Sequence, residues 1–328
     1  MVDVAERARV SLKTVSRVVN REPRVAGKTA ARVQRAIEAL GFRRHDGAAH
    51  LRRGSTTASL GLVLMDVADP FYSTLARAVE EVAQRHRFLV LAGSSNEDLD
   101  RERELVLALS ARRVDGLLVV PAGSDQGYLE PEVAAGTPVV FIDRPGVGVG
   151  GDAVLCDNAG GVRTAIAHLA GHGHRRIGFL GDAPTIFTAR ERLRGFREGV
   201  KALSRTAGAR PIAMGPHTLD SIGAALERFR SGTSPITAIV TGNNRITLLA
   251  LRALSRMGGF RPAMVGFDDL ELADLLHPAL TVIAQDASEL GRHAAELLFA
   301  RIAGDRRPEQ RIVLPVRLIA RGSGETAP

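Results

Sequence analysis

From residue 58 onward, short apolar segments alternate with segments of helical periodicity, and this alternation constrains the fold more than any other feature. Apolar runs such as Leu60-Gly61-Leu62-Val63-Leu64-Met65 are continuous, which is typical of parallel strands covered on both faces. The expected strands are 60–65, 88–92, 116–120, 139–142, 177–180, 238–241, 264–267 and 280–284. The expected helices are 72–87, 100–112, 159–171, 189–202, 218–230, 245–257 and 287–302. The pattern predicts a doubly wound α/β architecture.

The region after residue 58 is too long for one sheet of this kind, because single domains usually hold about 100–200 residues. Two lobes, each with its own parallel sheet, are the economical arrangement. Ligands bind at the carboxyl ends of the strands in such sheets. A ligand cleft is therefore expected between the two lobes.

The segment 4–20 has the pattern of two short helices that meet at Val10-Ser11. The Ser11 hydroxyl is suited to cap the second helix by accepting a backbone N–H. At 100° per residue, Val15 and Val18 share a face that can pack. The outer face consists of Leu12, Lys13, Ser16 and Arg17. This layout fits a helix-turn-helix, but on these residues alone an ordinary amphipathic helix pair with a solvated face fits equally well.

A third helix is expected from about residue 28 to residue 40, and Gly41 should end it. Its apolar face consists of Val33, Ile37 and Leu40. Residues 43–57 are then expected to form a basic linker that is weakly helical in its middle. Leu51 is the large apolar residue of this linker, and it has no apolar neighbours with which to form a core.

The net charge of +8 is confined to one part of the chain. Residues 1–55 contain 13 Lys and Arg against 5 Asp and Glu, whereas the remainder contains 31 of each kind. Neutralisation of phosphates by Lys and Arg supplies most non-specific affinity for DNA. A merely solubilising basic tail would lack the regular apolar spacing of this segment, so the charge favours a DNA-binding head.

Cysteine usage and hydropathy point to the cytoplasm. The single cysteine, Cys156, excludes an intramolecular disulfide and fits a reducing compartment. No apolar run approaches the ~20 residues of a membrane helix, and charged residues interrupt the N-terminus where a secretory segment would be apolar. We expect a cytoplasmic protein without a membrane partner.

An enzyme on a doubly wound fold, such as a ribosyl or sugar-phosphate hydrolase, is an alternative class. The sequence shows no Gly-rich phosphate loop, no metal-ligand cluster and no nucleophile motif. His172 and His174 are expected as a helix C-cap and surface histidines rather than metal ligands. We therefore expect neither catalysis nor a cofactor nor a bound metal.

Short motifs occur in order along nearly the whole chain. In the N-terminal segment they are Val2-Asp3-Val4-Ala5, Val10-Ser11 and Thr14-Val15-Ser16-Arg17-Val18. Later motifs are Asp69-Pro70-Phe71-Tyr72, Arg112-Arg113-Val114-Asp115-Gly116, Val140-Phe141-Ile142-Asp143-Arg144, His172-Gly173-His174-Arg175-Arg176-Ile177, Arg190-Glu191-Arg192-Leu193-Arg194-Gly195-Phe196, Gly242-Asn243-Asn244, Val265-Gly266-Phe267-Asp268-Asp269 and Leu280-Thr281-Val282-Ile283-Ala284-Gln285-Asp286. Each motif alone is weak. In this order and spacing, the chain resembles the LacI family of bacterial transcription regulators, of the lactose- and purine-repressor type.

The resemblance implies a domain organisation. It implies an all-α helix-turn-helix head at 1–45, a hinge at 46–57 and a region similar to periplasmic sugar-binding proteins at 58–328. That region would bind an effector and dimerise. Its implied lobes are 58–155 with 286–313, and 156–285 with 314–325.

The resemblance also places DNA contacts. Leu12, Lys13 and Arg17 occupy recognition-helix positions that reach base edges in the major groove, where an Arg can bond guanine O6 and N7. Phosphate or groove contacts are implied for Ser11, Ser16, Asn20, Arg24 and Thr29. Residues 46–53 match a hinge helix that forms when a dimer sits on its operator. In that helix, Ala48 and Leu51 lie in the minor groove, and Leu51 wedges into a central base step.

Effector positions carry over to the cleft between the lobes. They are Asp69, Phe71, Tyr72, Asp143, Arg190, Asn243, Asp268 and Gln285. Carboxylates and amides suit vicinal hydroxyl groups, an Arg suits a carboxylate or a ring oxygen, and Phe71 suits an apolar sugar face. Helix N-capping by Asp268 or Asp269 is an alternative role for that pair.

Some positions depart from the family pattern. Arg9 stands where Gly is usual in the helix-turn-helix turn, and a positive φ there costs a non-Gly residue roughly 1 kcal/mol or more. Ala26 replaces the usual Ser cap of the third helix, at a cost of about 1 kcal/mol. Asp69 replaces the usual Asn, and Asn244 replaces the usual Asp.

Together, these patterns predict a sequence-specific transcription repressor. It would bind palindromic double-stranded operator DNA as a homodimer, with a tetramer as an alternative. A sugar or a related metabolite in the cleft would control it. A solute-binding protein for sugar uptake is the competing interpretation, and it fits residues 58–328 but not the basic head.

Overall fold

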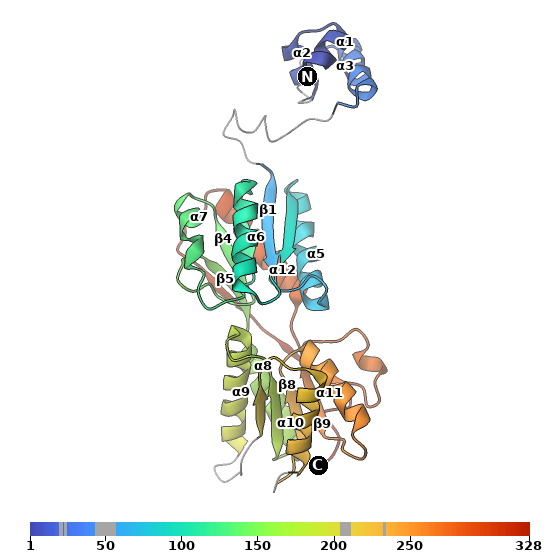
Figure 1. The fold of residues 1–328 in the computed structure, drawn as a ribbon, viewed down its shortest axis with the longest axis vertical. Helices are drawn as coiled ribbons and strands as arrows, with labels where there is room; N and C mark the ends of the chain where they lie inside the picture. Colours follow the sequence, from blue (N-terminus) through green and yellow to red (C-terminus); the bar gives the residue numbers. More distant parts are fainter. Residues whose placement is uncertain (20–21, 23–24, 43–56, 204–210, 232–233) are drawn as a thin grey trace. The chain divides into compact units, whose positions relative to one another are not determined.

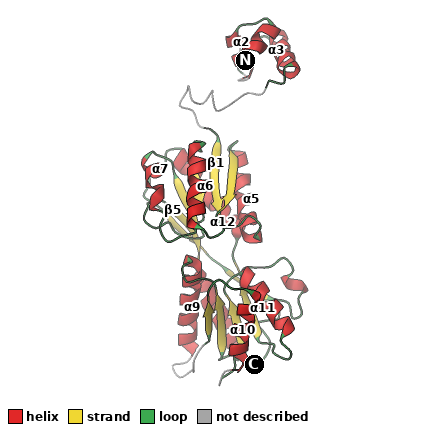
Figure 2. Cartoon of the chain, viewed as in Figure 1, coloured by secondary structure: helices red, strands yellow, loops and turns green. Residues whose placement is uncertain are grey.

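The computed structural model describes residues 1–19, 22, 25–42, 57–203, 211–231 and 234–328, and all structural statements concern these residues. The chain divides into two compact units, Met1–Thr57 and Ala58–Pro328. Figure 1 traces both units along the chain, and Figure 2 distinguishes their helices from their strands. The first unit is all helical where it is described, whereas the second is α/β.

The first unit is a three-helix head. Its helices are α1 (Val2–Ala8), α2 (Leu12–Val19) and α3 (Gly27–Ala39). They enclose a small core whose buried members are Val4, Ala5, Ala8, Val15, Val33 and Ala36. Val18 and Ile37 pack against this core as expected, but Leu40 is 40% exposed because α3 ends one residue before it. Because this core is small, few apolar contacts stabilise the head.

Two helix boundaries of the head carry costs. Arg9 follows α1 with φ 48° and ψ 52°, in the left-handed region that glycine adopts most easily. Ala26 precedes α3 and supplies no side-chain cap. In contrast, the Ser11 hydroxyl accepts the Thr14 backbone N–H at 3.2 Å, so the expected cap of α2 is present.

The second unit holds two six-stranded sheets. The first has the order β11-β5-β4-β3-β1-β2, and the second has the order β12-β10-β9-β8-β6-β7. All pairings are parallel except that β12 runs antiparallel to β10. The strands of the first sheet are β1 (Ser59–Leu64), β2 (Leu89–Ser94), β3 (Leu117–Val119), β4 (Val139–Ile142), β5 (Asp152–Cys156) and β11 (Arg311–Leu314). Those of the second are β6 (Ile177–Gly181), β7 (Ile212–Met214), β8 (Ala238–Thr241), β9 (Ala263–Phe267), β10 (Thr281–Ala284) and β12 (Arg317–Ile319).

Helices cover both faces of each sheet, as expected for a doubly wound fold (Figure 1). The first lobe contains α5 (Pro70–Arg85), α6 (Leu99–Ala111), α7 (Glu130–Ala134) and α12 (Ala287–Ile302), with the 3₁₀ turn η1 (Gly127–Leu129). The second contains α8 (Asn158–Gly171), α9 (Phe187–Leu203), α10 (Leu219–Ser231) and α11 (Asn244–Arg256), with η2 (Ala273–Leu275). The chain crosses between the lobes after β5, after β10 and after β11. Sequence-distant segments therefore build each lobe.

Eight expected strands are present within a few residues of their expected bounds, but β5, β7, β11 and β12 were not predicted. The edge strands β11 and β12 begin with the exposed Arg311 and Arg317 and lack continuous apolar runs. The interior strand β5 begins with Asp152, a buried carboxylate that pairs with Arg301 at 2.7 Å. Because this strand begins with a charged residue, a search for continuous apolar runs does not detect it.

Candidate functional site

The outer face of α2 presents the expected side chains. Leu12 is 50% exposed, Lys13 is exposed, and Ser16 and Arg17 are half-buried, whereas Val15 is fully buried beneath them. The rotation of the helix thus separates an apolar face from a face with donors and cations. This is the arrangement that places a recognition helix in the major groove.

Arg17 is not entirely free on this face. Its Nε lies 3.7 Å from the Glu22 carboxylate, and both side chains are about two-fifths exposed. Such a surface ion pair contributes about 0–1 kcal/mol, so Arg17 can leave Glu22 at little cost. Thr29 lies half-buried in the first turn of α3. The predicted contacts Asn20, Arg24, Ala48 and Leu51 lie outside the described residues, as does the predicted hinge helix.

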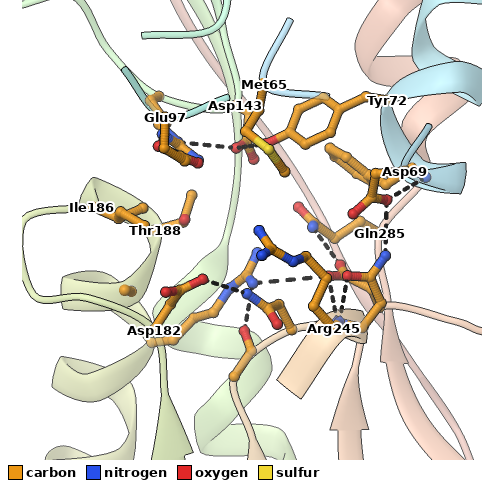
Figure 3. Close-up of a pocket in the computed structure, with 18 residues that line it drawn as sticks. Met65, Asp69, Tyr72, Glu97, Asp143, Asp182, Ile186, Thr188, Arg245 and Gln285 are labelled. Atoms are coloured by element: carbon orange, nitrogen blue, oxygen red, sulfur yellow. Dashed lines mark hydrogen bonds and ion pairs between the residues drawn. The ribbon is translucent and has the colours of Figure 1, made fainter. Parts of the chain in front are cut away.

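A polar cleft lies where strands of both sheets end. The empty space has a volume of about 500 Å³ including its opening to solvent. Its lining residues are Met65, Asp69, Phe71, Tyr72, Glu97, Asp143, Arg144, Asp182, Ile186, Thr188, Ala189, Arg192, Gly242, Asn243, Asn244, Arg245, Asp268 and Gln285 (Figure 3). Four of the polar members, Asp143, Asp182, Asp268 and Gln285, directly follow a strand. They meet in the cleft because the carboxyl ends of parallel strands lie at one edge of a sheet.

Asp143 dominates the first-lobe side of the cleft. It follows β4 with φ 65°, and it is only 3% exposed. Its Oδ2 accepts a long hydrogen bond from the Tyr72 hydroxyl (3.4 Å) and lies 3.5 Å from Arg144 Nε. Its Oδ1 is buried without a partner among the described residues. Burial raises the pKa of Asp143 despite the nearby Arg144 and Arg192.

Arg144 is held away from the centre of the cleft. Its two terminal nitrogens donate to the two Glu97 carboxylate oxygens at 2.6 and 2.5 Å, and Nη1 also donates to the Pro121 carbonyl at 2.8 Å. The bidentate geometry fixes the guanidinium plane. Arg144 therefore acts as a buried support behind Asp143.

Arg192 has the same supporting position in the second lobe. Its Nε donates to Asn158 Oδ1 at 2.7 Å, and its Nη1 donates to the Gly242 carbonyl at 2.6 Å. The guanidinium lies 3.8 Å from the centre of the Phe267 ring and 3.9 Å from Asp268. Stacking and hydrogen bonds together fix this buried cation.

Two amide–carboxylate pairs complete the second-lobe side. Gln285 Nε2 donates to Asp268 Oδ1 at 2.6 Å, and Asn243 Nδ2 donates to Asp182 Oδ2 at 2.9 Å. The Gln285 Oε1 atom remains buried without a partner among the described residues. The cleft thus presents orphaned acceptors from Asp143 and Gln285, which a ligand with hydroxyl or N–H donors can satisfy.

Among the described residues, a direct hydrogen bond joins the two sides of the cleft. Asn244, the first residue of α11, donates through Nδ2 to Oδ1 of Asp69, the N-cap of α5, at 2.8 Å. The same Asp69 oxygen accepts the Phe71 backbone N–H at 2.9 Å. Burial raises the Asp69 pKa, and these two hydrogen bonds oppose that effect. The family usually has Asn at position 69 and Asp at position 244. With the two residue types exchanged, an amide donor still lies opposite a carboxylate acceptor.

The structure brings together all but one of the predicted effector residues. Arg190 lies outside the cleft, and its Nη1 donates to the carbonyls of Pro184 and Thr185 at 3.2 and 2.7 Å. Residues two apart on a helix point about 200° away from each other, so Arg192 faces the cleft instead. Lining residues that the sequence reasoning missed include Glu97, Arg144, Asp182, Arg192, Asn244 and Arg245. Of these, Asp182 was detectable from its place directly after an apolar run.

The histidine pair behaves differently from the expectation in one respect. His172 is the C-cap of α8, but His174 is fully buried rather than a surface residue. Its ring nitrogens bond Thr237 Oγ1 at 2.9 Å and the Thr326 carbonyl at 2.8 Å, and burial lowers its pKa. The C-terminal segment that buries it is distant in sequence. Across the described ranges, no group of His, Cys, Asp and Glu is arranged to hold a metal ion.

In the part of the chain that the structure describes, no helix is both long and apolar enough to cross a bilayer.

Comparison with known proteins agrees with this division of the chain. Residues 1–45 match the family described as bacterial regulatory proteins, lacI family, and residues 166–324 match the periplasmic binding protein-like domain. The transcriptional regulator PtxS of Pseudomonas aeruginosa is 33% identical over 327 residues, which cover 98% of this chain and 94% of PtxS. The chain belongs to the lacI family.

Solved structures of lacI-family proteins have the same fold. The transcriptional regulator CelR in complex with cellobiose is 30% identical with a TM-score of 0.70, and the match covers 98% of each chain. The lac repressor dimer bound to operator and the anti-inducer ONPF is 26% identical with a TM-score of 0.83, covering 99% of this chain and 98% of that one. As a lacI-family member with a helix-turn-helix head, the chain is a DNA-binding transcription regulator, and the head excludes the simpler role of a solute-binding protein.

Proposed function

We propose that this regulator is a repressor that binds palindromic operator DNA as a homodimer and responds to a sugar or sugar derivative bound in the cleft. The observation that carries the proposal is the cleft itself. It combines buried, unpartnered acceptors with a direct hydrogen bond between its two sides, in a chain that also carries a DNA-binding head. We expect the bound molecule to be a signal and not a substrate that is turned over.

The outer face of α2 supports the proposed DNA contacts. Lys13 and Arg17 would reach base edges, with Arg17 donating to guanine O6 and N7 after it leaves Glu22. Leu12 supplies an apolar contact at the start of the helix. Ser11, Ser16, Asn20, Arg24 and Thr29 would contact phosphates and fix the register. Ala48 and Leu51 remain predicted minor-groove contacts of the hinge.

The chemistry of the cleft supports a polyhydroxylated ligand. Asp143 Oδ1 and Gln285 Oε1 lack donors, and hydroxyl groups supply donors in pairs. Phe71 lies beside them, and its ring suits an apolar sugar face. The CelR structure named above is a cellobiose complex. Asp69, Tyr72, Asn243 and Asp268 then form the remaining proposed wall.

The bond between Asp69 and Asn244 supports a coupling mechanism. A ligand that contacts Asp143 on one side and Gln285 on the other changes the free energy of the closed cleft relative to an open one. The lobes carry the dimer in the proposed assembly, so such a change alters whether two heads reach two half-sites of an operator. Only a ligand with different affinity for the two states can shift this equilibrium.

A binding screen followed by DNA-binding measurements tests the proposal. Sugars, sugar acids and nucleobases are screened by thermal shift, since a ligand at 100 times its Kd adds about 2.7 kcal/mol of stability. Each hit is then added to a gel shift with the palindromic DNA upstream of the gene and its neighbours, at low salt. Failure of the purified protein to bind any such DNA would refute the repressor role. Turnover of a sugar phosphate would instead indicate an enzyme.

A further inference from the structure

Arg245 occupies an unusual position in the cleft. It is the second residue of α11, it is exposed, and it lines the cleft. Figure 3 shows its side chain extending from α11 into the space between the two sides. The first turn of a helix carries positive backbone charge, so a cation there costs typically 0.3–1 kcal/mol. No acidic residue in that turn compensates for it.

The other guanidinium groups of the cleft are already bound. Arg144 is held by Glu97 and the Pro121 carbonyl, and Arg192 is held through Nε and Nη1 by Asn158 and the Gly242 carbonyl, with no hydrogen bond from Nη2 among the described residues. Within the described part of the chain, the Arg245 guanidinium has neither a hydrogen bond nor a carboxylate within 4.0 Å. Arg245 is thus the lining guanidinium that has no hydrogen-bond partner among the described residues, and all of its donors are available to a ligand.

Apart from Asp143, the carboxylates of the cleft also have partners, and Glu97 is paired with Arg144. Asp69 accepts from Phe71 N and Asn244, Asp182 accepts from Ala183 N and Asn243, and Asp268 accepts from Gln285. Arg245 is therefore not required to satisfy them. Since five carboxylates line the cleft against three guanidinium groups, a ligand with a single negative charge fits better than a dianionic phosphate ester.

We propose that Arg245 binds the carboxylate of a sugar acid whose hydroxyl groups donate to Asp143 and Gln285. This inference rests on the proposed function of the cleft as a sugar-type effector site. The planar guanidinium matches a carboxylate in two parallel hydrogen bonds. The N-terminus of α11, a helix of 13 residues, adds its positive end to the same place. The acidic group of the ligand offsets the cost of placing a cation there.

Matched pairs of ligands test this specificity. D-gluconate, D-galactonate and D-xylonate are compared by thermal shift and calorimetry with D-glucose, D-galactose and D-xylose, and D-glucose 6-phosphate represents the dianionic class. We expect at least one aldonate to bind and its aldose to bind at least 10-fold more weakly. Arg245→Gln should weaken aldonate binding about 10- to 100-fold, and Arg245→Lys should recover part of the loss. Arg252→Gln is the matched control, because Arg252 is exposed on the same helix but does not line the cleft.

The outcomes separate this inference from the proposed function. If an aldose binds, loses its affinity in Asp143→Asn and keeps it in Arg245→Gln, the effector site stands and the anionic specificity is wrong. If the phosphate ester binds more tightly than every aldonate, the assignment to a monoanionic carboxylate is overturned. If neither the aldonates nor the aldoses bind, both the proposed sugar-type site and this inference are refuted.

Discussion

Asp143→Asn should stabilise the ligand-free protein at neutral pH. The wild-type carboxylate is 3% exposed, one of its oxygens has no partner among the described residues, and its pKa is raised because burial outweighs the attraction of Arg144 and Arg192. The neutral amide removes the cost of an incompletely paired buried charge, taken as about 1–3 kcal/mol, the cost of an unsatisfied buried polar group. At about 2–4 °C per kcal/mol for a domain of 150–250 residues, Asp143→Asn should raise the Tm of the ligand-binding unit by roughly 2–12 °C at pH 7.

The pH dependence follows from the direction of the pKa shift. The ordinary aspartate value is 3.8, and the folded value is higher. The stability contributed by the protonated group is fully present below the unfolded pKa and is lost as pH rises through the folded pKa. The Tm difference between Asp143→Asn and wild type should therefore be small near pH 4 and grow toward pH 7. Calorimetry of both proteins across this range measures it.

Asp269→Asn provides a control with the opposite sign. Arg321 donates to both Asp269 oxygens at 2.7 and 2.8 Å and lowers the Asp269 pKa. This stability is present above the unfolded pKa and is lost as pH falls through the folded pKa. Because the carboxylate is 37% exposed, Asp269→Asn should cost only about 0–1 kcal/mol at pH 7. A lower Tm for Asp143→Asn at pH 7, or a pH-independent difference from wild type, would refute the argument about Asp143.

Three further predictions concern the head and the bond across the cleft. Arg9→Gly should stabilise the head by about 0.5–1 kcal/mol, because glycine adopts φ 48° without strain; slower amide hydrogen exchange in α1 and α2 would show it. Glu22→Gln should tighten operator binding by about 0–1 kcal/mol, because it removes the ion pair with Arg17. Arg17→Ala should weaken operator binding by about 1–3 kcal/mol. Gel-shift titrations measure both affinities, and an unchanged affinity in both variants would exclude Arg17 as a base contact. Asn244→Ala should cost about 0.5–1.5 kcal/mol in thermal unfolding because it removes one of the two donors to Asp69 Oδ1. The reciprocal double variant Asp69→Asn with Asn244→Asp should recover most of this loss.

Sequence patterns were sufficient for the fold class because its signals are local. Strands such as β1, with six buried residues, appear as continuous apolar runs, and helices between them show helical periodicity. Strand β5 was not predicted because it begins with the charged residue Asp152, which is compensated by Arg301, a residue far along the chain. A local pattern cannot report such a pairing.

The candidate cleft was predicted less completely than the head. The head is a short segment whose faces follow from helix rotation, and the structure places Leu12 and Lys13 outside and Val15 inside as expected. In the cleft, the choice of Arg190 instead of Arg192 followed from motif matching without a known helix phase. The orientation of α9 against its sheet decides that choice.

The sequence by itself determined a basic helix-turn-helix head and two α/β lobes, because charge, apolar runs and periodicity act between near neighbours in the chain. Only the tertiary structure decided which charged groups remain available in the cleft. It gave Arg144 and Arg192 fixed partners, joined Asp69 to Asn244, and left Asp143 Oδ1 and Arg245 without partners among the described residues. These outcomes depend on distances between residues up to 175 positions apart, which the order of residues does not contain.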